Sequence, residues 1–330
     1  MMHLRLSSRL CALPIGLTLS LGWIIILHAQ APATGGRAIQ TPDSQVRCIS
    51  FSPDSQVLAS ANFGKVRLWD VATGKEVAAL DALNGGIYDV ALSADGRFLA
   101  ACDDKKIIRI WDARSRQEVK RIEAPEVIRY IAFAPDGAWL IGTGESVLKW
   151  TVAGNDPPAL LGKPSGRMDA FAVSPDGRTI AISVEFGQND VELWDATSGP
   201  MGRILGVEEP IHVPHADSIV FTPDSRRVAA CFMGRIYTWN VDDGQLTQKL
   251  EGDSAKPIVF SPDQRFLAAG SWKANGDESV RVYDASSGAE VWASTGHPNT
   301  FWDVCFSADG KWLAAGAGDG VILLWPSPNR

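Results

Sequence analysis

Residues 53–70 read PDSQVLASANFGKVRLWD, a tight turn followed by two short segments and a Trp-Asp pair. The turn has six counterparts along the chain: Ala94-Asp95-Gly96, Pro135-Asp136-Gly137, Pro175-Asp176-Gly177, Pro223-Asp224-Ser225, Pro262-Asp263-Gln264 and Ala308-Asp309-Gly310. Successive turn aspartates lie 41, 41, 40, 48, 39 and 46 residues apart. Self-similarity at such a period is typical of repeat architectures. The sequence therefore indicates one unit repeated seven times.

Each repeat is expected to fold as four short strands. In the first repeat, residues 46–51 are apolar and lead into the turn, whose Asp side chain can hydrogen-bond to the local backbone. Residues 57–61 return from the turn, and residues 65–69 alternate polar and apolar side chains with a period of two. Residues 76–80 follow a second turn as an outer strand. Sustained helical periodicity is confined to the first thirty residues, so the predicted fold is all-β.

These repeats resemble the WD-repeat (WD40) β-propeller family, whose units have this length and carry a Trp-Asp pair. The resemblance runs from about Arg37 to Trp325. It implies a seven-bladed β-propeller of four-stranded antiparallel blades, which we assign to residues 37–330. It also implies a role in protein–protein interaction, here in an exported, single-domain protein of bacterial type.

The family's structural histidine and turn aspartate are matched in few of the blades. Gly296-His297 is the single copy of the Gly-His pair, and Asp319 matches the turn aspartate. His212 precedes Phe221 by the same nine residues that separate His297 from Phe306, so we interpret it as a second structural histidine. Ala315 stands where the family's hydroxyl side chain would complete the hydrogen-bonded group.

One aromatic residue recurs at the end of the third strand of each repeat, and we predict that all seven are core residues rather than ligand platforms. They are Trp69, Trp111, Trp150, Trp194, Trp239, Tyr283 and Trp325. Each would bury about 150–250 Å² between adjacent blades.

The last repeat lacks an outer strand of its own, because only five residues follow Trp325. In the first repeat the outer strand ends at Leu80, seven residues before Ile87 in the next repeat. The residue seven positions before Val46 is Ile39, which is therefore the equivalent position. We therefore predict that residues 37–40 complete blade seven, since an unpaired edge would promote aggregation.

Residues 1–29 have the pattern of an export signal. Arg5 and Arg9 precede an uncharged run over residues 10–27 and a small residue, Ala29. The segment is interpreted as a cleaved signal peptide or a retained signal anchor, with residues 30–36 as a linker. Both interpretations place the propeller outside the cytoplasm, in the periplasm or secreted, with a possible tether to the inner membrane.

Charge and cysteine content narrow the classes of partner. Of the 31 basic and 38 acidic residues, cleavage would remove only Arg5 and Arg9, which leaves a net charge of −9. A protein with this negative charge is not expected to bind nucleic acid or anionic membranes. Cys48, Cys102, Cys231 and Cys305 each lie in an apolar run, which favours buried free thiols.

Catalytic and cofactor motifs are absent from the sequence, which predicts a protein without enzymatic activity or cofactor. The one candidate metal cluster is Glu208, Glu209, His212, His215 and Asp217. Pro210 and Pro214 make that segment an extended loop, so a metal site is not predicted.

Two surfaces are candidates for binding a protein partner. Longer repeats place extra loop residues around blades four to six, where an interaction patch would contain Phe186, Glu208, Glu209, His215, Trp272 and Lys273. The residues that enter the seven first strands form the second candidate, around the central channel: Arg47, Tyr88, Arg129, Asp169, Asp217, Lys256 and Trp302.

The sequence therefore predicts an exported, non-catalytic protein-interaction scaffold. Two alternatives stay open at this point: a propeller-type hydrolase or lactonase with histidines and carboxylates in the channel, and a small-ligand or glycan-binding module on the Trp272 loop.

Overall fold

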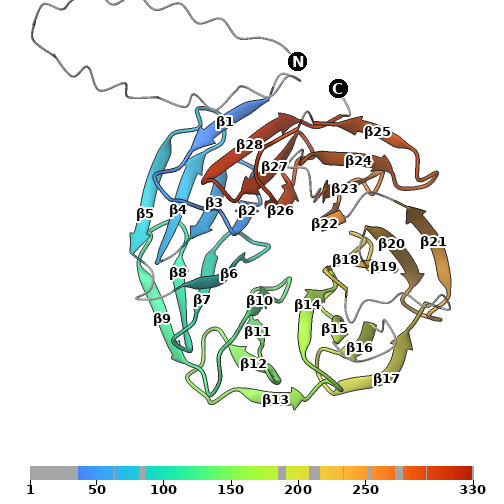
Figure 1. Cartoon of the computed structure of the whole chain (residues 1–330). Helices are drawn as coiled ribbons and strands as arrows, with labels where there is room; N and C mark the ends of the chain where they lie inside the picture. Colours follow the sequence, from blue (N-terminus) through green and yellow to red (C-terminus); the bar gives the residue numbers. More distant parts are fainter. Residues whose placement is uncertain are drawn as a thin grey trace, which may run out of the picture.

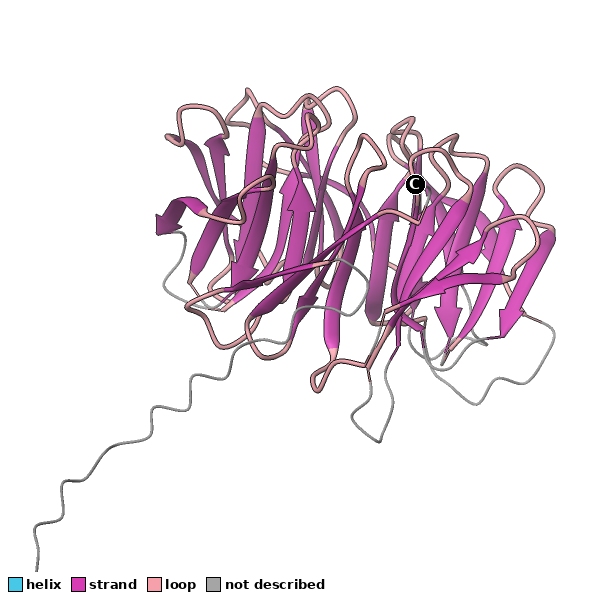
Figure 2. Cartoon of the chain, turned by 90° about the horizontal axis from the view of Figure 1, so that it is seen from above, coloured by secondary structure: helices cyan, strands magenta, loops and turns pink. Residues whose placement is uncertain are grey.

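The computed structural model describes residues 36–62, 64–81, 86–184, 191–207, 216–232, 234–251, 255–271, 278–294 and 296–328. These residues form seven four-stranded antiparallel sheets arranged in a ring around a central channel (Figure 1). Figure 2 shows the strands of each blade standing along the ring axis, with turns at both rims. The predicted seven-bladed all-β propeller is confirmed.

Each of blades one to four is built from four consecutive strands, with the first strand innermost. Blade one contains β2 (Cys48–Phe51), β3 (Val57–Asn62), β4 (Lys65–Asp70) and β5 (Glu76–Asp81). Blade two contains β6 (Ile87–Leu92), β7 (Phe98–Asp103), β8 (Ile107–Asp112) and β9 (Glu118–Glu123). Blade three contains β10 (Tyr130–Phe133), β11 (Trp139–Thr143), β12 (Val147–Thr151) and β13 (Ala159–Gly162). Blade four contains β14 (Met168–Val173), β15 (Thr179–Val184), β16 (Val191–Asp195) and β17 (Gly199–Leu205).

Blades five and six repeat this order, and blade seven combines both ends of the chain. Blade five contains β18 (Ser218–Phe221), β19 (Arg227–Phe232), β20 (Arg235–Asn240) and β21 (Leu246–Glu251). Blade six contains β22 (Ala255–Phe260), β23 (Phe266–Ser271), β24 (Val280–Asp284) and β25 (Glu290–Ala293). Blade seven contains β26 (Phe301–Phe306), β27 (Trp312–Ala317), β28 (Val321–Pro326) and β1 (Arg37–Gln40).

The recurring Asp turn closes the hairpin between the first two strands of each blade. In blade one the Asp54 carboxylate accepts the Ser52 hydroxyl at 2.6 Å and the Gln56 amide at 3.0 Å. Ser55 completes the turn with a φ of 60°, the left-handed region that favours glycine. Because glycine adopts this left-handed conformation without strain, four of the seven turns have Gly directly after the turn aspartate.

The recurring aromatic residues lie at the seams between blades. Trp239 is 1% exposed and packs against Val191 and Leu193 of the preceding blade. Trp325 is equally buried and shares a cluster with Val280 of blade six. The same arrangement holds around the ring, because every one of the seven aromatic residues is 7% exposed or less. The core is therefore a set of seven interblade layers.

β1 closes the ring, as the repeat arithmetic predicts. It pairs antiparallel with β28, Arg37 opposite Leu324 and Gln40 opposite Val321, and Figure 1 shows it as the outermost strand of blade seven. Ile39 is 4% exposed and lies in a cluster with residues of blade one. The prediction that an N-terminal strand completes the last blade is confirmed.

The first strand of blade one begins later than predicted. Residues 46–51 were expected as one strand, whereas β2 begins at Cys48. The reason is that the Val46 amide donates to the Ala317 carbonyl of blade seven at 3.0 Å, which directs the chain toward its neighbour before the ladder with β3 begins.

The family-like polar group in blade seven is partly formed. His297 Nε2 lies 3.6 Å from Asp319 Oδ2. In blade one the Trp69 indole donates to the Ser60 hydroxyl at 2.8 Å. Ala315 occupies the equivalent place in blade seven, and the Trp325 indole nitrogen finds no acceptor among the described residues. Packing alone therefore holds Trp325.

The N-terminal segment and His212 lie outside the described residues. Within the described ranges, no helix has the length and apolar character needed to span a bilayer. In the described part of the chain the cysteines are free thiols: Cys48, Cys102, Cys231 and Cys305.

Candidate partner-binding site at the channel mouth

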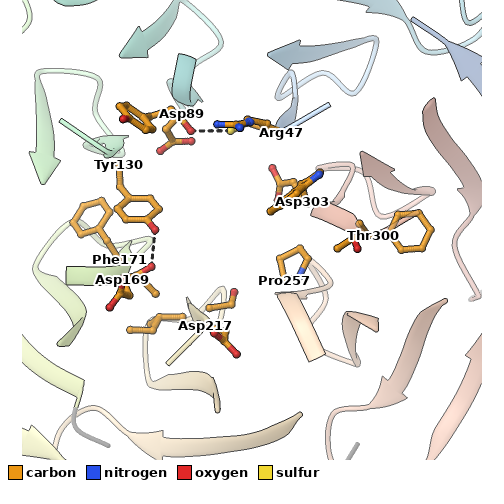
Figure 3. Close-up of a pocket in the computed structure, with 16 residues that line it drawn as sticks. Arg47, Asp89, Tyr130, Asp169, Phe171, Asp217, Pro257, Thr300 and Asp303 are labelled. Atoms are coloured by element: carbon orange, nitrogen blue, oxygen red, sulfur yellow. Dashed lines mark hydrogen bonds between the residues drawn. The ribbon is translucent and has the colours of Figure 1, made fainter. Parts of the chain in front are cut away.

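A cavity of about 730 Å³ opens at the centre of the ring (Figure 3). The innermost strands supply its walls, so each blade contributes between one and four residues near the start of its first strand. Carboxylates and aromatic rings dominate the lining, with Arg47 as the one basic side chain among the described residues that line it.

One repeat position, six residues before the turn aspartate, forms the inner wall of the channel. In blade order it is occupied by Cys48, Asp89, Tyr130, Ala170, Ser218, Pro257 and Asp303. Five of these side chains carry a group that can donate or accept a hydrogen bond, and all five use it on a neighbouring blade.

Two carboxylates join neighbouring blades through backbone amides. Asp303 Oδ2 accepts the Ile49 amide at 2.8 Å, which links blade seven to blade one. Asp89 Oδ2 accepts the Ile131 amide at 2.9 Å, which links blade two to blade three. The other oxygen of each carboxylate accepts the amide of the next residue in its own strand at 2.8 Å. Both side chains are therefore held in fixed positions on the wall.

The remaining links use a thiol and two hydroxyls. Cys48 Sγ donates to the Tyr88 carbonyl at 3.3 Å, and the Tyr130 hydroxyl donates to the Asp169 carbonyl at 2.6 Å. The Ser218 hydroxyl accepts the amide of Ile258 at 3.2 Å. Five hydrogen bonds between neighbouring blades thus run along the channel wall.

Burial changes the acidity of these groups. It raises the pKa of Asp89 and of Asp303 to about 7, because the charged carboxylate is poorly solvated at the wall. Burial, and then the two neighbouring carboxylates, raises the pKa of the Cys48 thiol well above its usual value. Burial also raises the pKa of Tyr130 to about 12. The Cys48 thiol and the Tyr130 phenol therefore stay protonated near neutral pH.

The two raised carboxyl pKa values predict that the protein is more stable at pH 5 than at pH 8. In the unfolded chain an Asp has a pKa of about 3.9, so the folded state binds more protons between about pH 4 and pH 7. The stabilisation is complete below pH 4 and is lost as the pH rises through 7. We expect a decrease of about 2–4 kcal/mol in the free energy of unfolding from pH 5 to pH 8, a value reduced for contact with channel water.

Denaturant unfolding at pH 5, 6, 7 and 8 measures this effect. Asp89→Asn/Asp303→Asn removes both titrating carboxyl groups, and each amide oxygen can still accept one of the two backbone hydrogen bonds that the carboxylate accepts. We therefore expect a lower stability at every pH and a flatter slope. Turn aspartates such as Asp54, whose pKa the Ser52 hydroxyl lowers, produce the opposite trend only below about pH 4. An unchanged slope in the double variant would show that other groups cause the pH dependence.

The structure brings five of the seven predicted strand-entry residues together at the channel. They are Arg47, Tyr88, Asp169, Asp217 and Trp302. Tyr88 is 36% exposed and Trp302 is 52% exposed, so both aromatic rings are accessible at the mouth. The sequence analysis did not identify the residues that directly follow the strand-entry positions. Three of them, Asp89, Tyr130 and Asp303, also line the channel.

The two other strand-entry residues are placed differently. Arg129 lines a neighbouring cavity, and Tyr130 takes the corresponding place in the channel. In blade three the strand-entry residue and the residue after it thus line different cavities, whereas in blade one both Arg47 and Cys48 line the channel. In blade six Pro257 lines the channel next to Lys256, whose side chain is outside the described set.

The predicted loop patch falls outside the described residues. It comprises Phe186, Glu208, Glu209, His215, Trp272 and Lys273. Of the candidate metal cluster only Asp217 is described, at the channel wall. The described part of the chain contains no group of three or more side chains that could hold a metal ion.

Comparison with known proteins finds WD40 repeats in this chain. The family model "WD domain, G-beta repeat" matches residues 36–70, 74–112, 244–284 and 289–326. These segments contain all strands of blades one, six and seven, the three inner strands of blade two and the outer strand of blade five.

Several curated proteins are similar over most of the chain. "Target of rapamycin complex subunit LST8" of Bos taurus is 25% identical over 67% of this chain and 71% of its own length. "Serine-threonine kinase receptor-associated protein" of Rattus norvegicus is 24% identical over 82% of this chain and 75% of its own. "Echinoderm microtubule-associated protein-like 1" of Homo sapiens is 25% identical over 85% of this chain and 34% of its own. By fold and by sequence, this chain is a seven-bladed β-propeller that contains WD40 repeats.

Proposed function

We propose that the protein is an exported, non-catalytic scaffold that binds a protein partner at the channel mouth. The observation that carries the proposal is the pair of accessible aromatic rings, Tyr88 and Trp302, at the edge of a cavity of about 730 Å³. Aromatic residues that border a pocket are the commonest anchors of protein interfaces. The three relatives named above are all named for an association, with a complex, a receptor or microtubules.

The lining favours a basic partner segment. Asp169 and Asp217 lie at the channel wall, and Asp89 and Asp303 add negative charge to the extent that they ionise. Arg47 opposes them with one positive charge. A Lys or Arg side chain from the partner would therefore gain from the carboxylates, and its aliphatic stem could lie against the aromatic rings.

A hydrolase or lactonase site is a weaker interpretation of the same cavity. The lining residues that the structure describes include carboxylates and no histidine. The oxygens of Asp89 and Asp303 already accept backbone amides, which fixes both carboxylates as interblade links. These links support a structural role for the two acidic side chains.

Export rests on the pattern of residues 1–29. Cell fractionation and N-terminal sequencing test it. A soluble product that begins at Gln30 in the exported fraction would support a cleaved signal, and an intact chain in the membrane fraction would support an anchor. A full-length cytoplasmic product would contradict export.

Removal of the two exposed aromatic side chains should abolish partner binding. In affinity capture from the cell envelope, we expect Tyr88→Ala/Trp302→Ala to lose the partners that the unchanged protein retains. Two interface anchors of about 2 kcal/mol each would weaken the affinity about a thousandfold. The matched control is Val77→Ala/Leu160→Ala, which removes exposed apolar side chains from the outer strands. If both variants retain every partner, the channel mouth is not the binding site.

A further inference from the structure

A second cavity of about 640 Å³ adjoins the channel mouth over blades two to four. Tyr88 lines both cavities, so its ring forms part of the border between them. The basic residues of the outer cavity come from three neighbouring blades: Lys106, Arg129 and Arg167. All three are exposed at the surface. The outer cavity therefore gathers positive charge beside a channel that gathers negative charge.

Neighbouring residues of two blades divide between the cavities. In blade three, Arg129 lines the outer cavity and Tyr130 lines the channel. In blade four, Arg167 lines the outer cavity and Asp169 lines the channel, with Arg167 Nη2 3.4 Å from Asp169 Oδ1. This ion pair and the Tyr88 ring thus mark the boundary where the sign of the charge changes.

Two acidic residues, Glu126 and Glu145, also line the outer cavity. The Glu126 carboxylate is directed to the turn between β11 and β12, where Oε1 accepts the Glu145 amide at 2.9 Å and the Ser146 amide at 2.7 Å. Its other oxygen accepts the Ser146 hydroxyl at 3.3 Å. Because backbone donors already stabilise this charge, Glu126 competes weakly for the basic side chains.

The Lys106 ammonium is held at the cavity by the Pro125 carbonyl, to which Nζ donates at 3.2 Å. A carbonyl leaves the positive charge uncompensated. Arg167 pairs with Asp169 and Glu126 accepts backbone amides, so the outer cavity sets Lys106 and Arg129 against Glu145.

We propose that the outer cavity binds an acidic side chain of the same extended protein segment whose basic side chain enters the channel mouth. The inference rests on the proposed function and deepens it, because it assigns the partner a short motif of opposite charges. An extended segment advances about 3.3 Å per residue, so two adjoining cavities would be reached by side chains a few positions apart. The Arg and Lys side chains supply charge-assisted hydrogen bonds to the carboxylate.

Selection from a library of displayed random twelve-residue peptides against the purified protein tests the proposal. We expect enrichment of peptides with Lys or Arg and, within a few positions, Asp or Glu. Lys106→Gln/Arg129→Gln should retain the basic preference and lose the acidic one. Lys106→Glu/Arg129→Glu should replace the acidic preference by a second basic one. The matched control Lys75→Gln/Arg121→Gln removes the same charges from exposed positions outside both cavities and should select the original motif.

Titration of one selected peptide gives the magnitude. Exchange of its acidic residue for the amide should weaken binding about three- to tenfold to the unchanged protein, the range for two exposed ion pairs, and less than twofold to Lys106→Gln/Arg129→Gln. Enrichment of basic residues alone, or an acidic preference that survives in this variant, would overturn the inference and leave the proposed function intact. Failure to enrich any motif would overturn the proposed function itself.

Discussion

A chain that begins at Val46, and so lacks β1, is expected to lose about 4–6 kcal/mol of its free energy of unfolding. The loss combines burial of Ile39, which is 4% exposed, with the ladder that β1 forms along β28. Arg37 adds a hydrogen bond from its guanidinium to the Val71 carbonyl at 2.9 Å, which ties blade seven to blade one. Since domains are stable by only about 5–15 kcal/mol, the shortened chain should be close to unfolding at room temperature.

The control separates β1 from the residues that follow it. The shortened chain also loses Asp43, whose carboxylate lies 2.7 Å from Arg67 Nε. Replacement of residues 37–40 by Gly-Ser-Gly-Ser keeps that ion pair and removes the strand. Both variants should show a lower denaturation midpoint, and a synthetic peptide of residues 36–42 added in trans should raise it again. Midpoints equal to that of the unchanged protein would mean that β28 does not need its outer partner.

Trp239→Ala is expected to cost about 3–5 kcal/mol, the second large effect. The indole is 1% exposed, lies 5.9 Å from the Tyr237 ring and 6.4 Å from the Phe232 ring, and donates to the Gly206 carbonyl at 3.3 Å. Its removal would leave a cavity at the seam of blades four and five, because strands on both sides are fixed by their own ladders.

Denaturant unfolding measures the change, with Trp302→Ala as the matched control. That substitution removes the same side chain from a position that is 52% exposed, and we expect it to change stability by less than about 1 kcal/mol. Similar losses for both variants would show that burial at the seams does not account for the tryptophan pattern.

The sequence was sufficient to predict the blade number, the strand order and the closure of the ring. The turn aspartates and the seam aromatics are local signals that recur with one period, so each copy supports the others. Ile39 could be placed because the distance between blades is nearly constant. The start of β2 was misplaced, because the bond from Val46 to Ala317 joins residues that only the closed ring brings together.

The candidate site was less predictable. Arg129 and Tyr130 are adjacent in sequence but line different cavities, a division set by the direction of each side chain in the folded blade. The sequence does contain a pattern that marks Asp89 and Asp303, because polar residues recur six positions before the turn aspartate in most repeats. Their role could not be derived from it, since their backbone partners belong to the next blade.

The pairing of β1 with β28 has a consequence for how the protein forms. β1 can pair only after β28 has been synthesised, because Arg37 lies opposite Leu324. The other six blades are each built from contiguous strands and can form without this long-range pairing. During that delay the edge of β28 is open to the β1 of another molecule. Strand exchange between two rings would satisfy the same register in both, so a domain-swapped dimer is the natural by-product of folding at high concentration.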